Sequence, residues 1–187
     1  MGKGDGKPRV VAQGRYLTFL DDAGWEYVTR PHVRGIVVIV PVTAAGRLVL
    51  VEQYRTAVHK RVIELPAGMV GDADGRRAES MADAAARELE EETGYAAAEM
   101  KFLFEGPIAV GVSDEEVSFF HARGLTRVGP GGGDETEDIT VHEVALGELS
   151  GFFAEKQTEG LGVDPKIYAG LYLAGIHTHG LSGNSGS

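Results

Sequence analysis

Residues 64–95 constrain the fold more than any other part of this 187-residue chain. The segment starts at the end of a strand (residues 63–65) and continues through a Pro-Ala-Gly turn into a loop rich in glycine and charged residues. A helix is predicted to follow over residues 79–93, with Gly94 as its C-terminal stop. Its apolar residues recur at helical spacing and should face the core: Ala78, Met81, Ala82, Ala85 and Leu89.

Three carboxylates lie beside the apolar side of this helix. Glu88, Glu91 and Glu92 are spaced three and four residues apart, so they share one helix face. Like charges at this spacing repel each other, and Mg²⁺, which prefers oxygen ligands, is the natural ion to neutralise them. The alternative is that the run is a solvated helix face, as most charge runs are. The position next to the apolar side, with Arg87 placed to pair with Glu91, favours the metal.

The run Arg87-Glu88-Leu89-Glu90-Glu91-Glu92-Thr93-Gly94-Tyr95, with Glu79 eight positions before Arg87, resembles the Nudix box of pyrophosphohydrolases. The turn Leu65-Pro66-Ala67-Gly68 is similar to the start of the box in nucleotide-sugar members. The resemblance implies that two or three Mg²⁺ ions, or Mn²⁺, bind Glu88, Glu91, Glu92 and the main-chain carbonyl of Ala67. It also implies catalytic roles for Glu91 and for Arg87, which would orient the carboxylates.

The chain departs from the family pattern at one point. That pattern has five residues between its first Gly and its first Glu, whereas ten separate Gly68 from Glu79. We therefore expect residues 69–78 to form an expanded loop ahead of an unchanged helix.

Composition narrows the possible classes of protein. The net charge of −10 argues against a nucleic-acid partner, which needs clustered Lys and Arg. The absence of cysteine excludes disulfides and thiolate metal sites. No apolar run approaches the roughly 18 residues of a membrane span, and the N-terminus does not read as a signal peptide. We expect a cytoplasmic, soluble protein that binds no membrane.

Two strands are predicted before the main sheet, over residues 9–20 and 25–30, as a hairpin around the turn at residues 21–24. In proteins similar to ADP-ribose pyrophosphatases, such a segment packs on a partner subunit and walls the nucleotide site, which implies a homodimer. Trp25 and Tyr27 either stack on a base there or pack on the sheet.

Residues 35–43 form a nearly continuous β-branched run, which predicts a central strand buried on both faces. The chain returns over residues 48–54 and reaches Arg55. A lone arginine at a strand end is usually a surface charge, but this position is similar to the substrate-facing arginine of the family, where it would hold a diphosphate in bidentate fashion. Arg30 and Arg34 are weaker candidates for the same role.

The second half of the chain continues to alternate strands and helices. Ser113 and Glu115, in a loop, resemble a substrate-proximal Ser-Asp-Glu segment of nucleotide-sugar members. An Asp164 N-cap and Pro165 at the first helical position start the last helix. Strands are predicted over residues 100–110, 117–122 and 139–144, and helices over residues 146–156 and from 164 onward.

A glycine-rich loop over residues 126–136 is predicted to be flexible, and the general base is predicted to lie in residues 131–138. Carboxylates held by cations are poor bases because their pKa is driven down, so another group must take the proton. Glu135 and Glu137 are the candidates, with Glu135 ahead, because the segment from Glu135 is similar to the one that carries the base in ADP-ribose pyrophosphatases. There are two alternatives. Glu137 could bind a metal through water, or the acidic loop could simply be solvated.

These observations predict an α/β fold: a Nudix-type α/β/α sandwich with a mixed sheet (residues 35–178), preceded by the N-terminal hairpin (residues 9–34). Residues 1–8 and 179–187 are expected to be disordered. The resemblance implies Mg²⁺-dependent hydrolysis of the pyrophosphate bond of a nucleoside diphosphate sugar, with ADP-ribose favoured. The alternatives are a hydrolase of GDP-mannose or another such sugar, and a non-catalytic Nudix-fold module that senses nucleotides.

Overall fold

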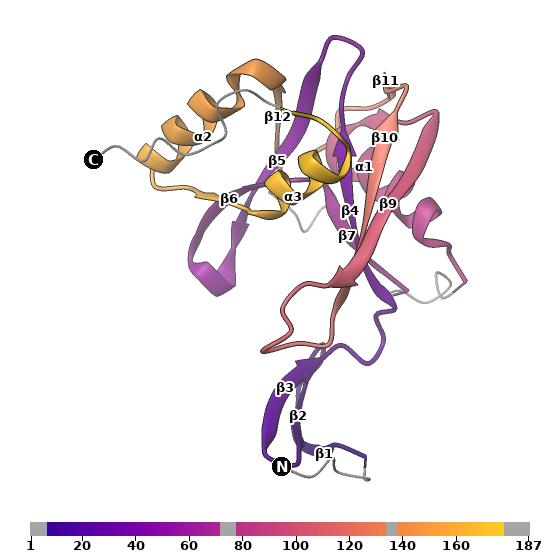
Figure 1. Cartoon of the computed structure of the whole chain (residues 1–187), viewed down its shortest axis with the longest axis vertical. Coiled ribbons are helices and arrows are strands. Elements are labelled where there is room, and N and C mark those ends of the chain that lie inside the picture. The colour runs from indigo at the N-terminus through magenta and orange to yellow at the C-terminus, as the bar shows by residue number, and fades with distance from the viewer. Residues whose placement is uncertain (1–6, 72–77, 134–137, 178–187) are drawn as a thin grey trace.

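The computed structural model describes residues 7–71, 78–133 and 138–177 (Figure 1). Two four-stranded sheets and three helices form the body, and a three-stranded sheet at the N-terminus projects from it (Figure 1). No helix in these ranges has the length and apolar character needed to span a membrane.

The N-terminal sheet has three antiparallel strands, β1 (Arg9–Gln13), β2 (Thr18–Asp22) and β3 (Trp25–Thr29). The predicted continuous strand over residues 9–20 is therefore wrong: a turn closed by the Gly14 N–H on the Leu17 carbonyl (2.8 Å) divides it. The turn between β2 and β3 is as predicted. Ala23 and Gly24 both have positive φ, the geometry that matches the twist of a tight hairpin.

The first sheet of the body has the order β7-β4-β10-β9. Its central strand β4 (Gly35–Pro41) pairs in parallel with β10 (Glu116–Arg123) and antiparallel with β7 (Ala67–Val70), and β9 (Glu99–Pro107) forms the outer edge. The prediction that Ala67 and Gly68 form a turn and that Met69 begins a loop is wrong. These residues form β7 because β4 offers its second edge for pairing.

The second sheet has the order β12-β5-β6-β13. Its bounds are β5 (Arg47–Arg55), β6 (Lys60–Glu64), β12 (Thr140–Ala145) and β13 (Gly162–Val163), with a 3₁₀ turn, η1 (Thr56–Val58), between β5 and β6. Two short strands, β8 (Tyr95–Ala96) and β11 (Thr126–Arg127), pair separately.

The central helix α1 (Met81–Thr93) begins two residues later than predicted. Ser80 is its N-cap and accepts a hydrogen bond from the Asp83 N–H (3.1 Å), which satisfies a donor that the first turn leaves unpaired. Gly94, at φ 72°, ends the helix as predicted. The predicted apolar side shifts accordingly: Ala78 is exposed, whereas Ala84 is buried.

The other helices lie near the C-terminus. A 3₁₀ turn, η2 (Leu146–Glu148), leads into α2 (Leu149–Thr158), and α3 (Lys166–Leu173) follows β13. Pro165, not Asp164, occupies the N-cap position of α3, which corrects the prediction. Asp164 still contributes, because its Oδ1 accepts the Lys166 N–H (2.8 Å).

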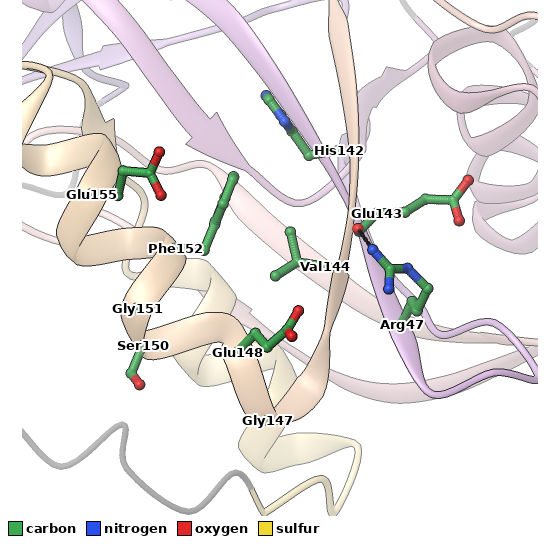
Figure 2. A pocket seen from close by; sticks show the side chains of 10 residues that line it. All are labelled: Arg47, His142, Glu143, Val144, Gly147, Glu148, Ser150, Gly151, Phe152 and Glu155. Atoms are coloured by element: carbon green, nitrogen blue, oxygen red, sulfur yellow. Dashed lines mark hydrogen bonds between the residues drawn. The ribbon is translucent and has the colours of Figure 1, made fainter.

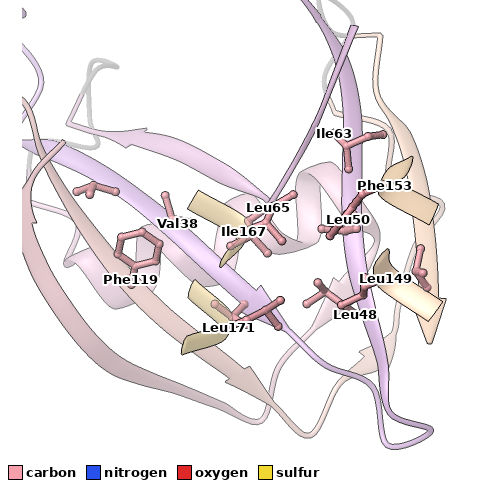
Figure 3. Packing of buried hydrophobic residues seen from close by; sticks show 13 residues of the cluster. Val38, Leu48, Leu50, Ile63, Leu65, Phe119, Leu149, Phe153, Ile167 and Leu171 are labelled. Atoms are coloured by element: carbon pink, nitrogen blue, oxygen red, sulfur yellow. The ribbon is translucent and has the colours of Figure 1, made fainter. Parts of the chain in front are cut away.

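Two buried clusters lie on opposite faces of β4, because successive side chains of a strand point to opposite sides. Val38 and Val40 belong to the cluster formed with α2 and α3 (Figure 3), and Val37 and Ile39 to the cluster formed with α1. Helices thus cover both faces of a mixed sheet. This confirms the predicted sandwich and places α1 and its carboxylates against the strands β4 and β7.

Candidate active site

A cavity of about 390 Å³ opens where the two sheets of the body meet α1. Three groups of residues line it. The box helix and β7 contribute Ala67, Gly68, Arg87, Glu88, Glu91 and Glu92. The sheet that contains β4, with the loops beside it, contributes Arg30, Ile36, Ile108, Glu115 and Val117. The sheet that contains β6, with the start of α3, contributes Gln53, Arg55, Glu64, Leu65 and Lys166.

The three predicted carboxylates all reach this cavity. Glu92 is only 3% exposed, and its Oε2 accepts the Ala67 N–H (3.2 Å), which ties α1 to β7. Glu88 lies directly over Gly68, where a Cβ atom would be 1.9 Å from the Glu88 carboxyl carbon. Glycine at position 68 is therefore what lets the carboxylate approach the main chain of β7.

Arg87 binds two of these three carboxylates, Glu88 and Glu91. Its Nη1 donates to Glu88 Oε1 and Glu91 Oε2, both at 2.8 Å, which confirms the predicted pairing with Glu91. Its Nε donates to Glu79 Oε1 (3.0 Å). Burial lowers the pKa of Arg87, but the contacts with Glu79, Glu88 and Glu91 outweigh it and raise that pKa, so the guanidinium stays charged.

The residues on one wall of the cavity have the chemistry that suits a hard divalent cation. Ala67, Glu88, Glu91 and Glu92 line it, and carboxylate and main-chain carbonyl oxygens are the ligands that Mg²⁺ prefers. Within the described ranges, no three His, Asp or Glu side chains are already gathered in a metal-binding geometry. The guanidinium of Arg87 lies between Glu88 and Glu91 and makes an ion pair with each.

Two further arginines line the cavity, Arg30 from the segment between β3 and β4 and Arg55 from the end of β5, and each is held by a carboxylate. Arg30 Nε donates to Glu115 Oε1 (2.5 Å), and Arg55 Nε donates to Glu64 Oε2 (2.7 Å). Burial raises the pKa of Glu64, and the hydrogen bond from Arg55 offsets only part of that shift. Arg34, the other weak candidate, donates instead to the Glu79 carbonyl (2.9 Å) and does not line the cavity.

Three predicted substrate residues do not line this cavity. Trp25 is 62% exposed on the N-terminal sheet, and Tyr27 lies on the same strand, so their stacking on a base stays a prediction. Ser113 is buried, and its hydroxyl accepts the Glu115 N–H (3.0 Å). Its contribution in this structure is to order the loop that presents Glu115 to Arg30.

Sequence reasoning missed Glu64, Gln53 and Lys166 as cavity residues. The sequence did contain a signal for Glu64. It is a carboxylate at the end of an apolar strand, next to the predicted Pro-Ala-Gly turn, and this position predicts burial beside the site. Lys166 gave no signal, since its position depends on where α3 returns to the sheet.

The glycine-rich loop is docked against α1 over the part that the structure describes. The Gly132 N–H donates to the Glu92 carbonyl (2.8 Å) and the Gly133 N–H to the Glu91 carbonyl (3.0 Å). A Cβ atom at Gly131 would lie 2.4 Å from the Thr93 carbonyl carbon. Residues 131–133 are therefore packed against α1, and the flexibility of the loop stays a prediction. Glu135 and Glu137 lie outside the described residues, so their role as base stays a prediction.

A second cavity, of about 590 Å³, lies between β12 and α2 (Figure 2). It is broad and shallow, and its guanidinium, Arg47, is already bonded to the Glu143 carbonyl. None of the box residues lines it. The concentration of carboxylates and basic groups makes the cavity beside α1 the candidate site.

Residues 31–160 match the family described as NUDIX domain. A methanol dehydrogenase activator of Bacillus methanolicus is 34% identical over 124 residues, 66% of this chain and 64% of that protein. An ADP-ribose pyrophosphatase of Bacillus subtilis is 34% identical over 113 residues, 60% of this chain and 58% of that protein. Another ADP-ribose pyrophosphatase, from Mycobacterium tuberculosis, is 39% identical over 130 residues, 68% of this chain and 61% of that protein.

The chain thus spans less than two thirds of the length of each of these relatives. A solved structure described as an ADP compounds hydrolase superposes with a TM-score of 0.64, covers 92% of this chain and 95% of its own, and is 23% identical. That likeness establishes the fold.

Proposed function

Because the chain belongs to the NUDIX family, we propose that it hydrolyses the pyrophosphate bond of a nucleoside diphosphate sugar, with ADP-ribose cleaved to AMP and ribose 5-phosphate. One observation carries the proposal: the box carboxylates share a single cavity with Arg30 and Arg55, which enter it beside different sheets. That arrangement suits a diphosphate held between cations. Two relatives named ADP-ribose pyrophosphatase support the choice of substrate.

The residues that would hold the metal are Glu88, Glu91, Glu92 and the Ala67 carbonyl. When bound there, two or three Mg²⁺ or Mn²⁺ ions supply charge neutralisation and lower the pKa of water. Arg87 orients Glu88 and Glu91 through the hydrogen bonds described above. Arg55 and Arg30 bind non-bridging phosphate oxygens, for which a guanidinium fork is well matched. Direct attack by water on phosphorus requires no protein nucleophile.

The attacking water must lose a proton, and the base we propose is Glu135, with Glu137 as the other candidate. The docked residues 129–133 bring the chain to the C-terminal end of α1, beside Glu91, immediately before this segment. Glu135→Gln should lower kcat by about 10²-fold or more with KM little changed, the size of a lost general base. Glu137→Gln is the matched variant: a loss confined to it exchanges the two roles, and no loss in either moves the base elsewhere.

We also propose that the protein acts as a homodimer through the N-terminal sheet. Leu17, in the turn between β1 and β2, and Trp25, on β3, are 40% and 62% exposed, and exposed apolar side chains that lie close together mark an interaction surface. A two-fold dimer is the commonest way to cover such a surface. Trp25 and Tyr27 would then wall the nucleotide side of the site.

A hydrolase of GDP-mannose or another nucleoside diphosphate sugar would use the same carboxylates, because no base or sugar pocket is distinguished by the described residues. A non-catalytic sensing module would be expected to lack one of the carboxylates, and all three line the cavity.

The proposal is tested by measuring AMP release from ADP-ribose with Mg²⁺ and again with excess EDTA. Hydrolysis that depends on Mg²⁺ is expected. Binding of ADP-ribose without AMP release would instead establish a sensing module. A parallel panel of GDP-mannose and ADP-glucose ranks the sugars by kcat/KM, and a preference for GDP-mannose would overturn the assignment to ADP-ribose.

A further inference from the structure

Two basic side chains on one side of the cavity are each held by a buried carboxylate. Arg55 Nε donates to Glu64, which is 7% exposed. Lys166 Nζ donates to Asp164 Oδ2, and Asp164 is 8% exposed. Arg55 and Lys166 both line the cavity, whereas Asp164 does not. The ammonium group of Lys166 thus lies between a buried carboxylate and the cavity.

The two ion pairs are neighbours because β13 pairs with β6. Val163 lies opposite Ile63, and the Asp164 N–H donates to the Ile63 carbonyl (2.9 Å), so Asp164 lies beside the end of β6, where Glu64 follows. The same aspartate accepts the main-chain N–H of Lys166. Side chain and main chain together therefore fix Lys166 at the start of α3.

Both cations retain hydrogen-bond donors for a ligand. A guanidinium has five N–H donors and an ammonium three, and the bonds to Glu64 and Asp164 each use one. Charge-assisted hydrogen bonds of this kind are the strong ones, and pre-held donors lose little freedom on binding. Phosphate oxygens are the acceptors that match both groups.

The opposite basic group, Arg30, follows the end of β3 and lies in the same part of the chain as the exposed aromatics Trp25 and Tyr27. In the proposed reaction those aromatics serve the base, so we assign Arg30 to the nucleotide half of the substrate. Arg55 and Lys166 come from the other sheet and from α3. We therefore assign Arg55 and Lys166 to the half of the substrate that carries the sugar.

We propose that Arg55 and Lys166 form a subsite for the phosphoryl group on the sugar side of the substrate, and that Lys166 is a specificity-determining residue for that half. The assignment to the sugar side rests on the proposed function. The anion-binding property itself rests on the two held cations.

The experiment measures binding of the two products separately, by titration calorimetry with Mg²⁺, so that no turnover is required. Lys166→Met should weaken binding of ribose 5-phosphate about tenfold, the loss of one charge-assisted contact, and change binding of AMP less than about threefold. Lys101→Met is the matched control, since Lys101 is exposed on β9 outside the cavity. Lys166→Arg keeps the charge beside Asp164 and should restore most of the lost affinity.

Unchanged affinity for ribose 5-phosphate in Lys166→Met overturns the subsite, as does wild-type protein that binds no ribose 5-phosphate. Equal losses for both products overturn the assignment to the sugar side. Circular dichroism would show whether the Lys166→Met variant folds. If it does not fold, Lys166→Gln is used in its place and the same results support or overturn the subsite. Lys166-dependent binding of ribose 5-phosphate in a protein that releases no AMP would sustain the subsite and reject the proposed function.

Discussion

At Gly68, the absence of a side chain determines where a carboxylate of the box can lie. The Glu88 carboxyl group occupies the space that a Cβ atom would fill, so its position depends on one residue of β7 as much as on α1. The family motif contains this glycine, but only the pairing of β7 with β4 shows that the contact is with a strand and not with a turn.

Gly68→Ala should therefore displace Glu88 and lower kcat by at least about tenfold, because a 1.9 Å approach cannot be relieved without moving the carboxylate. The measurement is kcat and KM for ADP-ribose, with the melting temperature alongside. Gly147→Ala is the control, since its added methyl group would meet no atom within 4 Å. Equal kcat in Gly68→Ala and the wild type would show that Glu88 does not act from this position.

Glu91→Gln and Glu92→Gln should each reduce turnover by orders of magnitude while leaving the fold intact, since each removes a ligand charge from a crowded set of carboxylates. Circular dichroism and a Mg²⁺ titration of kcat measure the two effects. Glu90→Gln, on an exposed residue of the same helix that does not line the cavity, should retain activity. Full activity of both variants at saturating Mg²⁺ would reject them as metal ligands.

The sequence predicted the contact between Arg87 and Glu91 because both residues lie on one helix. Arg87 and Glu91 are one turn apart, so their contact follows from helix geometry alone. Lys166 and Glu64 are separated by about a hundred residues in the chain, and their meeting depends on how β13 pairs with β6. Such long-range placement leaves no periodic trace in the sequence.

Among the elements, the glycine-rich loop has a tertiary contact that its sequence did not predict. Three consecutive glycines suggested freedom of movement, yet Gly131, Gly132 and Gly133 each take a positive φ and pack against the end of α1. Glycine is used here for close approach between main chains. Strand β7 was not predicted because the sequence Pro-Ala-Gly is typical of turns. Its residues are extended because they pair with β4, and this pairing is not visible in the local sequence. The strands β4 and β5, whose apolar runs are long, were predicted correctly.

Gly131→Ala should destabilise the protein and lower kcat, because the added methyl group would both strain a positive φ and press on Thr93. Gly160→Ala is the matched control: Gly160 has φ +89° but nothing within 4 Å of the added methyl group. Strain alone costs about 1 kcal/mol, or a melting temperature lower by about 2–4 °C. We expect at least twice that shift for Gly131→Ala, measured by calorimetry, with kcat reduced only in this variant. Equal shifts in both would show that the docking contributes nothing.

At the scale of the whole molecule, the N-terminal sheet stands apart from the body (Figure 1). Every residue of β1 is exposed, and β9, an outer edge of the body, exposes Phe102 and Phe104 by 54% and 50%. Sequence patterns place these aromatics on strands but do not predict that their side chains are exposed, because exposure depends on which elements pack against β9.

Light scattering should give the mass of a homodimer at micromolar concentration. The double variant Leu17→Ser, Trp25→Ser should shift the mass toward that of the monomer, because it removes apolar area from the surface that we propose to be buried. Tyr172→Ser, which changes a 75% exposed residue of α3, should stay dimeric. A monomeric wild type would contradict the proposal.

Glu91 and Glu92 each face the cavity with the side chain and bind the glycine-rich loop with the main chain. Their side chains face the cavity, and their main-chain carbonyls hold Gly133 and Gly132. The last turn of α1 therefore positions the two carboxylate side chains and the docked glycines together. A displacement of this turn would move residues 132–133 and the cavity side chains of Glu91 and Glu92 as one unit.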